Sequence, residues 1–144
     1  IKHTGCVNRI RSTRINDKCF AASWSELGKV YIWDLSNALK AVNDSKDMSD
    51  FVKKDSQLPI FQFAGHQSEG FAIDWSPIAH GQLATGDCNK FIHVWKMVEN
   101  GSWIVDQRPY TGHTASVEDI QWSPNEPSVF ASCSVDKSIR VWDT

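Results

Sequence analysis

The 144-residue chain has neither a charge excess of one sign nor a long apolar run. Its 15 Lys and Arg side chains nearly balance 17 Asp and Glu, so the net charge is −2 and no basic excess is present to attract nucleic acid or an anionic membrane. The longest apolar runs are only a few residues, whereas a membrane-spanning helix needs about 20. We therefore expect these residues to bind no nucleic acid directly and to enter no membrane.

Cysteines are few and are not closely spaced: the chain has Cys6, Cys19, Cys88 and Cys133. No two of them form a C-x-x-C pattern, and the five histidines also lack the spacing of zinc ligands. Free buried thiols are therefore expected rather than disulfides, which favours a reducing compartment inside the cell. The sequence predicts no metal and no cofactor.

One pattern occurs twice at a constant offset of 47 residues, first from Gly65 to Trp95 and then from Gly112 to Trp142. Each copy opens on Gly-His, passes through Trp-Ser-Pro and closes on Ile-x-Val-Trp. A Gly-His opening and a Trp-Asp close at such a period are typical of WD-repeat β-propellers, whose repeats are roughly 40–45 residues long. Trp142 is followed by Asp143, which completes that close in the second copy.

Short β-rich runs separated by turn residues fill most of the chain. The predicted strands are 7–10, 19–23, 30–33, 60–63, 71–75, 82–85, 91–95, 103–106, 117–122, 129–133 and 138–142. The predicted fold class is therefore all-β: a partial WD-repeat β-propeller of about three antiparallel four-stranded blades. Rings close with about 4–8 blades, so we expect the chain to be part of a longer protein.

The first repeat is degenerate and is followed by extra residues. His3 lies 63 residues before His66, which is 16 more than the later period, and we place the excess after Trp33. The predicted organisation is a degenerate, incomplete blade, an insertion, a blade, and a blade without its last strand. Their ranges are 1–34, 35–58, 59–95 and 96–144.

The insertion is expected to be a helical or loop excursion outside the sheets. Ser36 is a candidate cap for a short helix that reaches Val42, and Ser49 for a second helical turn. The polar segment 43–47 between them is expected to be mobile. Two interpretations of the insertion remain open, a tolerated surface loop and a dedicated binding arm.

The repeated polar residues are of the types needed for a buried hydrogen-bond chain in each blade. An indole N–H can donate to a hydroxyl, the hydroxyl can bond an imidazole, and the imidazole can bond a carboxylate. The expected members are His66, Thr85, Asn89 and Trp95 in the earlier copy, and His113, Ser132, Asp136 and Trp142 in the later one. Asn89 stands 47 residues before Asp136, so an amide is expected there. In the first blade, Ala22 or Ser23 is expected near the hydroxyl position.

His113, Ser132 and Asp136 are also the residue types of a hydrolytic triad. The trio recurs almost intact one period earlier, and each copy comes with a tryptophan, whereas a catalytic triad has no need of duplication. We therefore interpret the trio as structural. The sequence predicts no catalytic residue and no enzyme activity.

The openings at 65–71 and 112–119, together with the string Val7-Asn8-Arg9, are more specific than WD repeats in general. In this order and spacing they resemble the histone-binding WD-repeat family that includes the retinoblastoma-binding chaperones, and most closely its glutamate-rich, ribosome-assembly members. The resemblance covers nearly the whole chain. It implies a seven-bladed ring and a location in the nucleus and nucleolus.

The resemblance also implies a partner and a set of residues that bind it. The partner would be a basic protein client, either a large-subunit ribosomal protein or histones, held by a scaffold or chaperone. The implied binding residues line the mouth of the central channel, and we call them the channel-mouth residues: Asn8, Glu69, Phe71 and Glu118. Phe71 stands where the relatives have tyrosine, and Cys6 where they have a further acid. Simpler readings are a turn cap for Asn8, an exposed charge for the two glutamates and packing for Phe71.

Two other functions stay open at this point. One is a substrate receptor of a cullin ubiquitin ligase, with a ligase adaptor as partner, and the other is a histone-binding subunit of a chromatin complex. Many such receptors carry Trp-Asp-x-Arg at a blade end. The string from Trp33 to Ser36 lacks the arginine, and Trp95 is followed by Lys96, whereas Trp142-Asp143-Thr144 agrees with the first three positions and leaves this function open.

Overall fold

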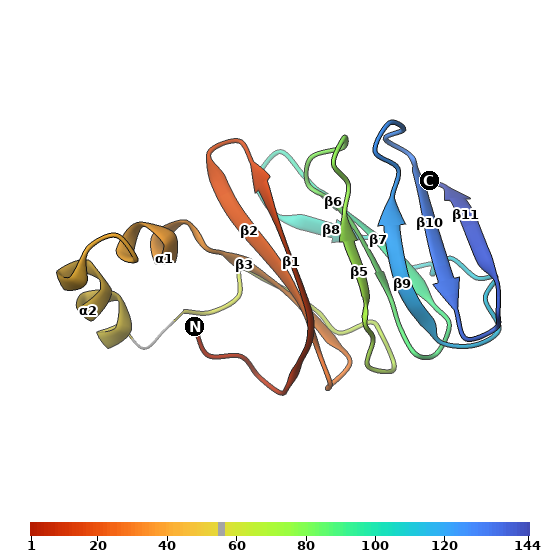
Figure 1. Ribbon diagram of the computed structural model, residues 1–144, viewed down its shortest axis with the longest axis horizontal. Helices are drawn as coiled ribbons and strands as arrows, with labels where there is room; N and C mark the ends of the chain where they lie inside the picture. Colours follow the sequence, from red (N-terminus) through yellow and green to blue (C-terminus); the bar gives the residue numbers. More distant parts are fainter. Residues whose placement is uncertain (55–56) are drawn as a thin grey trace.

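The structure, a computed structural model, describes residues 1–54 and 57–144 and consists mainly of three antiparallel sheets (Figure 1). The first sheet contains β1 (Val7–Ile15), β2 (Lys18–Ser25), β3 (Lys29–Asp34) and β4 (Phe61–Phe63) in that order. The second contains β5 (Ala72–Trp75), β6 (Gln82–Gly86), β7 (Ile92–Met97) and β8 (Trp103–Val105). The third contains β9 (Val117–Trp122), β10 (Val129–Ser134) and β11 (Ile139–Asp143). The predicted all-β class and the partial propeller are confirmed.

Strand β1 is longer than the predicted run 7–10. It continues through a polar stretch to Ile15, where it pairs with Lys18 of β2. Asn16 lies between these strands at φ 53°, a left-handed conformation that asparagine tolerates better than most residues. Backbone pairing around this tight turn therefore extends the strand, although its side chains are not apolar.

The sheets do not coincide with the predicted blade ranges. Strand β4 follows the insertion, yet it pairs with β3 through Val30–Phe63 and Ile32–Phe61. The first sheet is thus complete with four strands, and the second takes β8 from the range 96–144. The reason is that a sequence repeat begins in the outermost strand of one sheet and ends in the third strand of the next.

The insertion forms two helices, α1 (Ser36–Ala41) and α2 (Ser45–Lys53), which extend away from the sheets (Figure 1). The predicted caps are wrong. Ser36 is the first residue of α1 and donates its N–H to the Asp34 carboxylate, while α2 is capped by Asp44, whose Oδ1 accepts from the N–H groups of Lys46 and Asp47. Helix α2 therefore begins inside the segment 43–47 that was expected to be mobile. Residues 55–56 of the predicted insertion lie outside the described residues.

Adjacent sheets pack face to face, and indole groups connect them. One apolar cluster joins the first and second sheets around Trp24 and Trp95, and another joins the second and third around Trp122. The Trp24 N–H donates to the Ala72 carbonyl across the first boundary at 2.8 Å, and the Trp122 N–H donates to the Asp74 carbonyl across the second at 3.0 Å. This packing places β1, β5 and β9 next to one another as the innermost strands (Figure 1).

Candidate partner-binding surface

The second sheet contains a fully buried hydrogen-bond chain. The Trp95 indole N–H donates to Thr85 Oγ1 at 2.9 Å, and Thr85 Oγ1 lies 2.8 Å from His66 Nε2. On the other side of the ring, His66 Nδ1 lies 2.8 Å from Asp87 Oδ2. All four side chains are buried, and Asp87 is 0% exposed.

The carboxylate that bonds His66 in this hydrogen-bond network belongs to Asp87. The prediction that the amide of Asn89 takes this place is therefore wrong. Asn89 is exposed in the turn between β6 and β7. Asp87 also accepts the Phe91 N–H at Oδ1, 2.9 Å away, which closes the same turn. At the 47-residue offset, Asp87 corresponds to Ser134, whose hydroxyl donates to the Ala115 carbonyl instead. The sequence could have indicated Asp87, because it is the only carboxylate among residues 87–91, the turn between β6 and β7.

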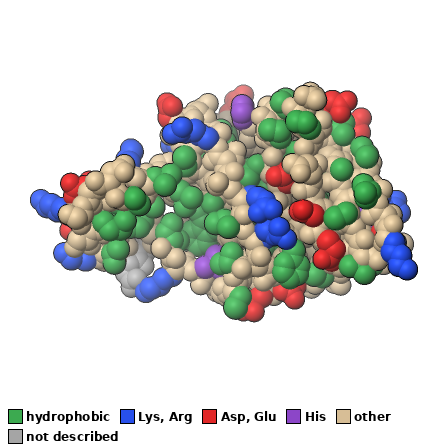
Figure 2. Space-filling view, viewed as in Figure 1, with side chains coloured by type: hydrophobic (Ala, Val, Ile, Leu, Met, Phe, Trp, Pro, Cys, Tyr) green, Lys and Arg blue, Asp and Glu red, His purple; other side chains and the backbone are tan. Residues whose placement is uncertain are grey.

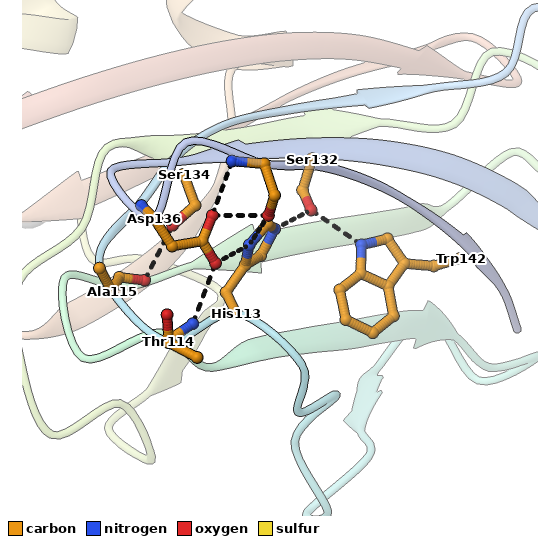
Figure 3. A network of polar contacts seen from close by, with 8 residues as sticks. His113, Thr114, Ala115, Ser132, Ser134, Asp136 and Trp142 are labelled. Carbon is orange, nitrogen blue, oxygen red and sulfur yellow. Dashed lines mark hydrogen bonds and ion pairs between the residues drawn. The ribbon is translucent and has the colours of Figure 1, made fainter.

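The third sheet contains the corresponding chain with a different acid (Figure 3). The Trp142 N–H donates to Ser132 Oγ at 2.8 Å, and Ser132 Oγ lies 2.7 Å from His113 Nε2. His113 Nδ1 lies 2.8 Å from Asp136 Oδ2, which also accepts the Thr114 N–H at 3.0 Å. The structure thus brings together all four residues that the sequence placed in this network.

The two networks differ in their electrostatics. Burial lowers the pKa of His66, which favours the neutral imidazole. With Nδ1–H donated to Asp87, the bare Nε2 then accepts the Thr85 hydroxyl proton. In the third sheet, the short hydrogen bond from the Ser138 hydroxyl, supported by the Thr114 N–H and His113, holds the pKa of Asp136 well below its usual range.

The first sheet keeps the indole, the hydroxyl and the imidazole of the network but, among the described residues, has no carboxylate in it. Ser23, one of the two residues considered, takes the hydroxyl position: its Oγ accepts the Trp33 N–H at 2.8 Å and lies 3.0 Å from His3 Nε2. His3 Nδ1 faces the Gly5 carbonyl at 2.9 Å in place of a carboxylate. In all three sheets the hydroxyl oxygen is therefore held between an indole and an imidazole.

Two of the channel-mouth residues meet across the boundary between the first and second sheets. Asn8, near the start of β1, donates from Nδ2 to Glu69 Oε2 at 2.8 Å and to the Gly70 carbonyl at 3.3 Å. Glu69 is exposed in the loop before β5, and half-buried Phe71 immediately precedes that strand. Glu118 is exposed at the start of β9, and no hydrogen bond found among the described residues joins it to the other three.

Further charged groups lie near the innermost strands. Figure 2 shows acidic side chains over β5 and β9, with a basic group between β1 and β5. Asp74 of β5 accepts the Trp122 backbone N–H at Oδ2, 2.8 Å away, and burial raises the pKa of Asp74. Asp119 of β9 and Arg11 of β1 act electrostatically on the same carboxyl group. The sequence repeat could not have identified these two acids. At the 47-residue offset Asp74 corresponds to Gln121, and Asp119 corresponds to Ala72, so neither acid recurs.

Within residues 1–54 and 57–144, no helix is both long and apolar enough to cross a membrane. The same residues contain no group of three or more His, Cys, Asp or Glu side chains arranged to hold a metal ion.

Comparison with known proteins shows which proteins this chain is similar to. Residues 101–143 match the family described as WD domain, G-beta repeat. The chain is 50% identical to Protein HEAT STRESS TOLERANT DWD 1 of Arabidopsis thaliana, with 99% of this chain and 30% of that protein aligned. It is 46% identical to Glutamate-rich WD repeat-containing protein 1 of Dictyostelium discoideum, covering 99% of this chain and 28% of that protein.

Two further relatives carry names that refer to ribosome assembly and to a histone acetyltransferase. Ribosome assembly protein rrb1 of Schizosaccharomyces pombe is 39% identical, with 99% of this chain and 30% of that protein aligned. Histone acetyltransferase type B subunit 2 of Aspergillus fumigatus is 29% identical, with 99% of this chain and 31% of that protein aligned. The chain therefore spans about 30% of the length of the relatives it matches. The repeated sheets, their Trp–hydroxyl–His networks and the match over residues 101–143 show that this chain contains WD repeats, and it is similar to proteins named for WD repeats and for ribosome assembly.

Proposed function

We propose that this chain helps a WD-repeat scaffold to hold a basic protein client, a large-subunit ribosomal protein or histones, during assembly in the nucleus and nucleolus. The observation that carries the proposal is the contact between Asn8 and Glu69 across two sheets, beside Phe71. The hydrogen bond from Asn8 fixes one carboxylate oxygen of Glu69 and leaves the exposed group available to a cation. The names of the relatives in ribosome assembly and histone acetylation support this choice of client.

The chemistry of the channel-mouth residues suits a lysine or arginine side chain. A carboxylate attracts the charged head, while an aromatic face such as that of Phe71 attracts a cation and packs against its aliphatic stem. Glu118 adds a second exposed carboxylate on the neighbouring innermost strand β9. Complementary charge at such a rim guides association and selects the partner.

We propose a non-catalytic role for the histidine networks. Ser132 is 3% exposed, and its oxygen lies between the Trp142 indole and the His113 ring. The same arrangement recurs around Thr85 in the second sheet and Ser23 in the first. Threefold recurrence favours a device that stabilises each sheet over a reaction centre.

The receptor role in a cullin ubiquitin ligase is the weaker candidate. The name of one relative contains the abbreviation DWD, but the string from Trp33 to Ser36 lacks the arginine of the receptor motif. Asp34 of that string is also occupied, because its carboxylate accepts the Ser36 N–H at the start of α1. A role as a histone-binding subunit of a chromatin complex differs from the main proposal in the assembly served, and the channel-mouth residues would serve either.

The test is charge reversal at the channel mouth of the full-length protein. Glu69→Lys combined with Glu118→Lys should weaken binding to a purified large-subunit ribosomal protein or to purified histones, measured by calorimetry at low and at physiological salt. The loss should be about 2–5 kcal/mol if the contact is buried, and otherwise should appear mainly as slower association.

The matched control reverses two exposed carboxylates elsewhere, Glu126→Lys with Asp50→Lys, and keeps the same net charge. Both double variants must show the wild-type circular dichroism spectrum. If the channel-mouth variant binds both clients as tightly as the control does at low salt, the client contacts another surface and the proposal is wrong.

A further inference from the structure

A groove of about 820 Å³ lies between the first two sheets, at the end of the strands opposite Asn8 and Glu69. It is bordered by the β1–β2 turn at Asn16, by Asp34 at the end of β3, and by the β7–β8 turn at 98–101. Its volume falls in the range of about 300–1,000 Å³ that is common for binding sites. All its lining residues are described, and they come from the two four-stranded sheets and the segment leading into β4.

The floor of the groove is apolar and adaptable. Ile15 and Phe20 are buried there, and Met97 and Val98 are half-buried. Ile60 adds an apolar side chain that is 48% exposed. Methionine adjusts its shape readily to an incoming apolar group. The floor therefore suits an apolar side chain of a partner.

The rim of the groove is predominantly acidic. Three carboxylates line it, from Asp17, Asp34 and Glu99, against the single ammonium group of Lys18. On the side of the insertion, Asp17 also borders a smaller hollow that contains Arg14 and Lys40, which offset its charge. The acidic excess is therefore concentrated toward Glu99, and it disfavours nucleic acid and anionic lipid as occupants.

The β7–β8 turn at the rim is held in place by local hydrogen bonds, and the β1–β2 turn is closed by the pairing of Ile15 with Lys18. The Val98 N–H donates to the Ser102 carbonyl at 2.9 Å, and the Gly101 N–H donates to the Val98 carbonyl at 2.8 Å. Asn100 Oδ1 accepts the Ser102 N–H at 2.9 Å. Because the turns are ordered without a partner, a ligand would lose little free energy in arranging them.

From the apolar floor, the acidic rim and the ordered turns, we infer that this groove is a second docking site, for a protein segment in which an apolar side chain is flanked by lysine or arginine. The apolar side chain occupies the floor above Phe20, and the cations face Glu99. The inference rests on the proposed function in one respect, the basic character of the client. It places a second contact at the opposite end of the sheets from the channel mouth, so that one client chain can be held at two points.

The test uses the full-length protein and short synthetic peptides as probes. One peptide alternates lysine with leucine and phenylalanine, a second has glycine at the apolar positions, and a third has glutamate at the lysine positions. Only the first should bind, and it should slow hydrogen exchange in the β1–β2 and β7–β8 turns. Binding of the second or third peptide with equal affinity would contradict the assignment of floor and rim.

Two matched pairs of variants locate the site. Glu99→Lys should lower the affinity for the first peptide about tenfold, while Glu126→Lys, a glutamate in a turn at the same end of the third sheet, should not. Ile60→Ser should lower it to a similar degree, while Ile78→Ser should not. Ile78 is a fair control because it is 44% exposed in the β5–β6 connection and does not line the groove. Equal losses in the variants and their controls would overturn the groove as the site.

The outcomes also separate this inference from the proposed function. If charge reversal at Glu69 and Glu118 weakens client binding while the groove variants bind peptide normally, the groove proposal is wrong and the channel mouth stands. If only the groove variants lose binding, the groove is supported and the channel-mouth proposal fails. If neither set has an effect, both proposals fail.

Discussion

The second and third sheets carry the same Trp–hydroxyl–His network but take their carboxylate from different positions in the turn that follows the strand. Asp87 comes two residues after the hydroxyl of Thr85 and is 0% exposed, whereas Asp136 comes four residues after Ser132 and lies in a turn. In both sheets the carboxylate oxygen is 2.8 Å from the imidazole Nδ1. The two repeats therefore keep a carboxylate at the same place beside the imidazole, although it comes from different positions in the sequence.

The same two sheets differ in the burial of corresponding strands. Ile92 and Val94 of β7 are 0% and 4% exposed, whereas Ile139 and Val141 of β11, each 47 residues later, are 78% and 73% exposed. The third sheet, which has three strands, has described neighbours on one face only, through the cluster around Trp122 and Phe130. In the 144-residue chain by itself, an equivalent substitution should therefore cost more in the second sheet than in the third.

The strongest test of the first difference compares Asp87 with Asn89. Asp87→Ala should lower the free energy of unfolding by about 3 kcal/mol, because it leaves the His66 Nδ1–H and the Phe91 N–H without a partner inside the protein. Asn89→Ala, at an exposed position in the same turn, should stay within about 0.5 kcal/mol of wild type. Urea denaturation of the full-length protein gives both values, and similar losses in the two variants would contradict the assignment of Asp87.

A smaller effect should distinguish the two tryptophans. Trp95→Phe removes a hydrogen bond and volume from a side chain that is 0% exposed, so we expect a loss of about 2 kcal/mol. Measured in the 144-residue chain by itself, Trp142→Phe removes the equivalent bond to Ser132 at a half-buried position and should cost about 1 kcal/mol. Client affinity should not change at low temperature in either variant. A greater loss for Trp142 would show that burial does not set the difference between the sheets.

Much of the fold was predictable because it depends on local patterns. Every observed strand overlaps a predicted run, since alternating β-branched and aromatic residues between turn signals reflect the pleat itself. The pairing of β4 with β3 across the insertion was not predicted, because residues 35–60 separate the two strands and no local pattern records which sheet the chain rejoins. The Asp44 cap was missed because the polar segment 43–47 was taken to be mobile, which placed the start of the second helical turn at Ser49.

The candidate site was less predictable than the fold. The third-sheet network could be read directly, because its four residues match the repeat pattern in type and order. Asp87 was missed because equal offset was taken to mean equal geometry. The contact between Asn8 and Glu69 joins residues 61 positions apart, and only the packing of one sheet against the next brings them together.

The smallest expected difference between the sheets is in their response to acid. Burial lowers the pKa of His66 below its value of about 6.5 in the unfolded chain, so unfolding takes up a proton at that residue. Its contribution to stability is therefore present above about pH 6.5 and is lost as the pH falls through the folded pKa. The pKa of Asp136 is also lowered, chiefly by the Ser138 hydroxyl, but from an unfolded value of about 3.9, so its contribution persists to a lower pH.

The urea midpoint should therefore decline in two stages, first as the pH falls below about 6.5 and again below about pH 4. Ser138→Ala removes the 2.6 Å hydrogen bond to Asp136 and should weaken only the lower stage, because the Asp136 pKa then moves toward its ordinary value. Asp87→Asn should change only the upper stage, since it alters the carboxylate that faces His66. NMR titration of the His66 ring and the Asp136 carboxyl group would assign each stage. If Ser138→Ala also removed the upper stage, the two networks would titrate together. The His66 and Asp136 groups would then interact electrostatically across the boundary between the sheets.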